Sequence, residues 1–126
     1  MAGPVDAVFF ARLTQANERF RTGLPDTLAQ LAAVRAQLTP SAPAPHAVAE
    51  LQSLLHALAG AAVTFGFREI GHGARGLEQR LRVLTAFETV GEDDWGAWLG
   101  ALDSFVAAGL RAPAPRYHSA AFSPLP

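Results

Sequence analysis

The sequence predicts an all-α fold, an antiparallel up-and-down four-helix bundle. Half of the 126 residues are hydrophobic, with alanine and leucine prominent, and this composition is typical of a helical globular domain. Apolar residues recur at spacings of three and four in four separate segments, and no segment makes a good strand candidate. The connections between these segments are mostly short, which favours antiparallel neighbours.

The first predicted helix spans about residues 6–38. Gly23 and Pro25 interrupt its apolar stripe, and proline fits the first turn of a helix but kinks a helix interior. We therefore expect either a kink near Leu24 or two helices, the second beginning at Pro25. The stripe consists of Phe9, Leu13, Phe20, Leu24, Leu28, Leu31, Val34 and Leu38.

Three further helices are expected, over about residues 45–65, 68–87 and 94–110. A Pro-rich connection precedes the first of them, and Gly66 is placed to end it. Asp93 or Asp94 is the expected N-cap of the last helix. The Pro-rich segment 112–126 has no periodicity, so we expect a bundle of residues 1–111 followed by an extended tail. The three stripes are Val48, Leu51, Leu55, Leu58, Ala62 and Phe65; Ile70, Ala74, Leu77, Leu81 and Leu84; and Trp95, Leu99, Leu102, Phe105 and Val106.

Composition narrows the class of function. The chain has no cysteine, which excludes disulfides, thiolate metal sites and a cysteine nucleophile. Its formal net charge of −1 gives no indication of a nucleic-acid or anionic-membrane partner. No signal peptide is recognisable, and no uninterrupted apolar run approaches the roughly 18 residues of a membrane span. The four histidines lack metal-ligand spacing. We expect a soluble cytoplasmic protein without a metal, a nucleic-acid partner or a membrane partner.

The segment HALAGAAVTFGF, residues 56–67, places a histidine on a helix flank that carries almost no charge. His56 follows the core residue Leu55, and its neighbours at helical spacing are Gln52, Ala59, Gly60 and Val63. Glycine inside a helix costs about 1 kcal/mol relative to alanine, so its presence here suggests that another surface approaches the backbone. The pattern predicts a protruding histidine on a bare docking patch. A neutral imidazole offers a nucleophilic nitrogen that can carry a phosphoryl group.

This segment resembles the signature of histidine-containing phosphotransfer (HPt) domains, which reads roughly His-x-Leu-Lys-Gly-small-small-x-x-x-Gly. Leu77 and Glu78 resemble the Leu-Glu pair of the family's following helix. The resemblance covers about residues 5–110, although only residues 56–78 are specific. The signature is matched without gaps by His56, Leu58, Gly60, Ala61, Ala62 and Gly66.

The resemblance implies an HPt-like bundle that relays a phosphoryl group between receiver-domain aspartates in a two-component phosphorelay. His56 would be the phospho-acceptor. Glu78, and Arg75 from its position on the same predicted helix, are candidate supporting groups near it. Response-regulator receiver domains and a hybrid sensor kinase would be the partners, and the receiver would supply Mg²⁺. The chain itself would be a monomeric phosphocarrier without cofactor, autokinase activity or ATP binding, rather than an enzyme. Receiver docking would use Gln52, Ala59, Gly60, Val63 and Phe67.

One residue departs from the family pattern: the lysine three positions after the histidine is Ala59 here. A cation there would offset the phosphoryl charge of about −2. Its loss leaves three alternatives open: a shorter-lived phosphohistidine, compensation by Arg68 or Arg75, or a pseudo-HPt adaptor that binds receivers without transferring phosphate. A structural helical oligomer that uses the bare flank for self-association is a further alternative. The RLR segment, residues 80–82, is interpreted as an ordinary solvated turn of helix.

Overall fold

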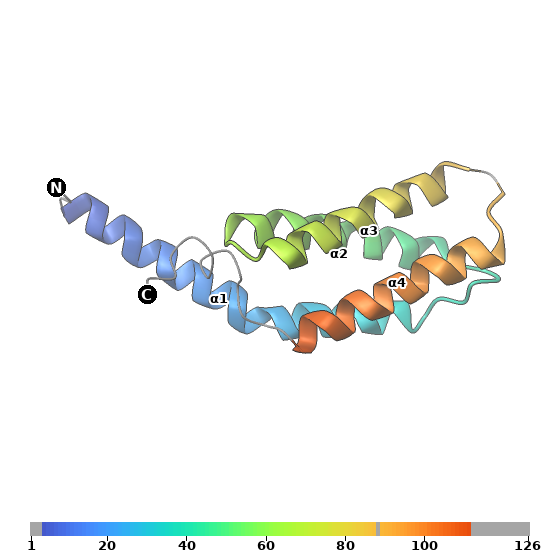
Figure 1. Ribbon diagram of the computed structural model, residues 1–126, viewed down its shortest axis with the longest axis horizontal. Coiled ribbons are helices and arrows are strands. Elements are labelled where there is room, and N and C mark those ends of the chain that lie inside the picture. The colour runs from blue at the N-terminus through green and yellow to red at the C-terminus, as the bar shows by residue number, and fades with distance from the viewer. Residues whose placement is uncertain (1–3, 88, 112–126) are drawn as a thin grey trace, which may run out of the picture.

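The computed structural model describes residues 4–87 and 89–111, and these ranges form a bundle of four α-helices without a strand (Figure 1). The helices are α1 (Pro4–Arg35), α2 (Pro45–Thr64), α3 (Arg68–Ala86) and α4 (Glu92–Arg111). The predicted all-α bundle is confirmed. The expected tail, residues 112–126, lies outside the described residues.

Each helix has two neighbours in the bundle. α2 lies against α1 and α3, and α4 lies against α1 and α3. The leucines of the predicted stripes meet in the centre, and fully burying one such side chain stabilises the fold by about 1.5–3 kcal/mol. The most deeply buried leucines are Leu24, Leu28, Leu31, Leu51, Leu55, Leu77, Leu81, Leu99 and Leu102.

α1 continues through Pro25 as a single helix. The alternative of two helices divided at Pro25 is therefore wrong, while the kink near Leu24 stays a prediction. Leu24 and Leu28 are at most 1 % exposed on either side of the exposed Pro25. We attribute the continuity to this packing, because burial of both leucines offsets the hydrogen bond that proline cannot donate.

The N-terminal half of α1 extends past the other helices (Figure 1). Phe9 and Leu13, which were expected on the core stripe, are 59 % and 40 % exposed, because no other described helix reaches them. The bundle begins at Phe20, whose ring centroid lies 5.5 Å from that of Phe65 and 4.9 Å from that of Phe67.

Gly66 ends α2 with a positive φ of 84°, a conformation that favours glycine. The Gly66 N–H donates to the Val63 carbonyl over 3.2 Å, and the Phe67 N–H donates to the Ala62 carbonyl over 2.8 Å. These two bonds form a Schellman motif, which satisfies carbonyls at the end of the helix. The motif turns the chain directly into α3, so that α2 and α3 lie side by side (Figure 1).

The start of α4 differs from expectation. Asp93 and Asp94 lie within the first turn of α4 rather than at its N-cap, because the helix begins at Glu92.

α2 is long and apolar enough to cross a membrane by length and composition alone. The core helix of a bundle passes the same test, and Leu51 and Leu55 of α2 are fully buried in the core.

Candidate functional site

His56 projects from the middle of α2 and its side chain is 71 % exposed. A Cβ atom placed on Gly60, one turn later, would meet nothing within 4 Å. Val63, one turn further, is 50 % exposed. The imidazole therefore stands out of the bundle beside an open stretch of helix.

Glu78 of α3 holds the imidazole in place. Its Oε2 atom lies 2.8 Å from Nδ1 of His56 and 2.8 Å from Nη2 of Arg82. The Glu78 side chain is only 8 % exposed, and Glu78 is the single charged residue that is buried within the described part of the chain. Burial by itself raises the pKa of Glu78, but the hydrogen bonds and electrostatic attraction of His56 and Arg82 outweigh it, so the net pKa lies below its ordinary value.

The hydrogen bond to Glu78 determines which ring nitrogen of His56 is free. An ionised carboxylate can only accept hydrogen bonds, so Nδ1 carries the proton and donates it to Glu78. In a neutral ring the other nitrogen, Nε2, then carries the lone pair. Because the ring is exposed, Nε2 is the nitrogen available for nucleophilic chemistry.

A shallow open hollow of about 270 Å³ lies beside the imidazole, between α2 and α3. The structure thus brings together two groups that were predicted to lie near His56, namely Glu78 and Arg75. It adds Gln79 and Arg82, which sequence reasoning missed, and it leaves out Arg68. The spacing of Arg75, Glu78 and Arg82 at three and four could have indicated one face of α3. The lining residues are His56, Ala59, Gly60, Arg75, Glu78, Gln79 and Arg82.

Two residues expected on the docking surface are buried instead. Ala59 and Phe67 are each 2 % exposed, so their side chains do not contribute to an exposed patch and that expectation is wrong. Ala59 faces α3, where a Cβ on Gly71 would lie 3.6 Å from the Ala59 carbonyl oxygen. Phe67 lies under the ring of Phe20. Small residues at 59 and 71 let the two helices approach closely.

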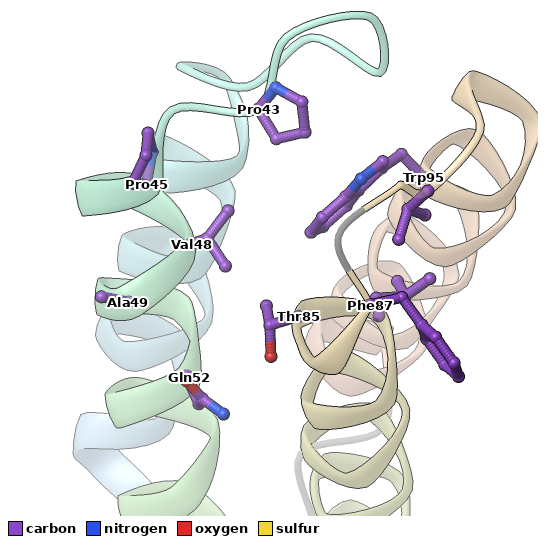
Figure 2. A pocket seen from close by; sticks show the side chains of 10 residues that line it. Pro43, Pro45, Val48, Ala49, Gln52, Thr85, Phe87 and Trp95 are labelled. Atoms are coloured by element: carbon purple, nitrogen blue, oxygen red, sulfur yellow. The ribbon is translucent and has the colours of Figure 1, made fainter.

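A second hollow of about 430 Å³ opens at the end of the bundle (Figure 2). Gln52 lines this groove and not the one beside His56, although it precedes His56 by one helical turn. Pro45, Val48 and Gln52 lie on one side of the groove, and Thr85, Phe87 and Trp95 lie on the other (Figure 2). Gln52 therefore belongs to this second hollow and does not line the one beside His56.

The fold and the site together define a class: a small four-helix domain with an exposed histidine that a buried carboxylate orients. The model of the Hpt domain family matches residues 15–108, and the chain belongs to this family. The family prediction made from residues 56–78 is therefore confirmed. No curated protein and no solved structure is detectably similar to the chain.

Proposed function

We propose that this Hpt domain carries a phosphoryl group on Nε2 of His56 and passes it between receiver-domain aspartates. The observation that carries the proposal is the exposed imidazole whose Nδ1 is held by the buried Glu78. A receiver aspartyl phosphate would be the donor, and a second receiver aspartate would be the acceptor. Membership of the Hpt family supports histidine phosphotransfer as the chemistry.

The transfer balances without any further reactant. The Nε2 lone pair attacks phosphorus, the N–P bond forms, and the P–O bond to the aspartyl carboxylate breaks with its electrons on oxygen. The imidazole then carries a positive charge and keeps its Nδ1 proton, which the Glu78 carboxylate stabilises. Reversal of the same step on another receiver returns the histidine to its starting form.

The open stretch of α2 around Gly60 and Val63 is the proposed docking surface, with Gln52 at its edge. The neighbouring face of α3 adds positive charge through Arg75 and Arg82, which suits the acidic, Mg²⁺-binding pocket of a receiver. In this proposal the helices run up and down in antiparallel order, the domain is a cytoplasmic monomer, and its partners are response-regulator receivers and a hybrid sensor kinase. The receiver supplies Mg²⁺, and this chain holds no cofactor.

A transfer assay tests the proposal. The chain is incubated with a receiver that carries labelled phosphate, and label should move to the chain in an acid-labile, base-stable form. His56→Gln should abolish labelling while the chain keeps its helicity, because the His56 side chain is exposed and lies outside the core. His72→Gln is the matched control, since His72 is also exposed but lies outside the hollow. Label that persists in His56→Gln would remove His56 from this role.

The second candidate function is a receiver-binding adaptor without chemistry. Ala59 favours it, because the lysine of the family signature is absent. A receiver that binds the chain tightly but never transfers label to it would support this alternative.

A further inference from the structure

Phosphorylation of His56 would place additional negative charge close to the carboxylate of Glu78. A phosphoryl group adds about −1.5 to −2 charges, and His56 already lies 2.8 Å from the buried Glu78 carboxylate. The chain contains no lysine, so all ten of its basic residues are arginines. Position 59 cannot carry a cation, because alanine occupies it and is packed against α3. Compensating charge therefore has to come from arginines on another element.

Two arginines of α3 border the hollow beside His56, namely Arg75 and Arg82. They are seven residues apart, which places them about 10 Å from each other along the helix. Glu78 and Gln79 lie between them in sequence and line the same hollow, so Arg75 and Arg82 both border the space beside the imidazole. Guanidinium groups bind phosphoryl oxygens in a bidentate manner and stay charged at any physiological pH.

Arg82 is held loosely in the unmodified protein. Its described ion pair is one contact of 2.8 Å, from Nη2 to Oε2 of Glu78, and its side chain is 61 % exposed. The guanidinium is largely in solvent and this is its one described contact, so water can solvate it when the side chain rotates away from the buried Glu78. Oε2 of Glu78 accepts a hydrogen bond from His56 Nδ1 as well as from Arg82. The bond to the imidazole does not involve Arg82, so Glu78 keeps it when Arg82 rotates away.

We propose that Arg82 and Arg75 form a phosphoryl-binding site that takes the place of the missing family lysine. Arg82 exchanges partners: it pairs with Glu78 while His56 is unmodified, and it pairs with the phosphoryl oxygens once the N–P bond has formed. Glu78 then balances the positive charge of the phosphorylated imidazole, and the arginines balance the phosphoryl group. This inference rests on the proposed phosphotransfer through His56.

The test measures the equilibrium distribution of label between the chain and a phosphorylated receiver. This ratio is a difference in free energy between the two phosphorylated proteins, so changes in docking rate do not alter it. Arg82→Gln should lower the ratio of phosphorylated chain to phosphorylated receiver about tenfold, as expected for loss of a charged contact. Arg75→Gln should lower it less, and Arg82→Lys should restore part of the ratio because it keeps the charge without the bidentate geometry.

Arg80→Gln is the matched control, because Arg80 is an exposed arginine on the same helix that does not line the hollow. It should leave the ratio within twofold of the unmodified chain. The ³¹P chemical shift of the phosphohistidine should change in Arg82→Gln and not in Arg80→Gln.

Three results would overturn the inference. An unchanged ratio in the double variant Arg75→Gln/Arg82→Gln, with His56 still labelled, would refute the arginine site and leave phosphotransfer intact. An equal effect of Arg80→Gln would show a response to net charge and not to a site. Absence of any label on His56 in the unmodified chain would refute the proposed function, and the inference with it.

Discussion

Glu78 is the residue through which the exposed histidine is connected to the buried interior. Its carboxylate is 8 % exposed, yet it accepts hydrogen bonds from two groups that lie largely in solvent, His56 and Arg82. Removal of either partner would leave a buried acceptor with less compensation, which generally costs 1–3 kcal/mol. The orientation of the imidazole and part of the stability of the fold therefore depend on the same side chain.

The ionisation of Glu78 makes a predictable contribution to stability. Its pKa in the folded protein is lowered from 4.5, because the hydrogen bonds and charges of His56 and Arg82 outweigh the effect of burial. Because the folded-state pKa is lowered, ionised Glu78 contributes its full stabilisation above about pH 4.5. This contribution is lost as the pH falls through the folded-state pKa. Glu78→Gln should thus cost about 1 kcal/mol at pH 7 and progressively less below pH 4.5.

Urea unfolding of both proteins at a series of pH values measures this difference. Glu50→Gln, on an exposed position of α2, is the control and should stay within about 0.5 kcal/mol of the unmodified protein at every pH. A difference for Glu78→Gln that stays constant down to pH 3 would contradict the assignment to ionisation.

Sequence reasoning predicted His56, Gly60, Arg75 and Glu78 as site residues, and the structure places all four around one hollow. It missed Arg82, although its partner Glu78 lies four residues earlier on the same helix, because the position of Arg82 beside the hollow that His56 lines depends on how α2 and α3 align. The same limit explains Ala59. Its position on the edge of the core stripe fits exposure or burial, and the close approach of Gly71 decides for burial.

At the scale of the element, two glycines of the α2 region have opposite roles. Gly66 adopts a φ of 84° at the end of the helix, whereas Gly60 lies within the helix beside open space. An alanine at 66 would be forced into the left-handed region, at a cost of about 1–2 kcal/mol. An alanine at 60 would meet no neighbour and would gain about 1 kcal/mol of helix propensity.

Gly66→Ala should therefore lower the free energy of unfolding by about 1 kcal/mol or more, and Gly60→Ala should raise it by up to about 1 kcal/mol. Urea titration of the two variants side by side measures both changes in the free energy of unfolding, one expected to be a loss and the other a gain. Equal destabilisation by the two substitutions would show that the difference in backbone conformation does not control stability at this end of α2.

The helices themselves were largely predictable, and their ends agree with expectation to within a few residues. The exception is α1, where Pro25 left two alternatives. Local sequence cannot choose between them, because proline fits both the start of a second helix and a tolerated interior position. Leu24 and Leu28 are buried in the core on either side of the proline, and this packing keeps α1 one continuous helix through Pro25.

At the scale of the whole molecule, α1 consists of two parts with different surroundings. From Phe20 onward its apolar side chains face the other helices, and this part falls within the family match to residues 15–108. Residues 6–15 are exposed in the described structure, and they include Phe9 and Phe10, each 59 % exposed. The apolar stripe continues across both parts, so its period predicted the helix but not the point at which the bundle ends.

The two parts should differ in their contribution to stability. Replacing Phe9 and Phe10 together by alanine should change the free energy of unfolding by less than about 0.5 kcal/mol, because both rings are already largely in solvent and alanine favours the helix. Leu28→Ala, in the other part, removes a side chain that is 0 % exposed and should cost about 2–5 kcal/mol. Denaturant unfolding at two protein concentrations a hundredfold apart measures both. A large loss for the phenylalanine variant at either concentration would mean that these rings are covered in solution, and a loss confined to the higher concentration would identify a second copy of the chain as the cover.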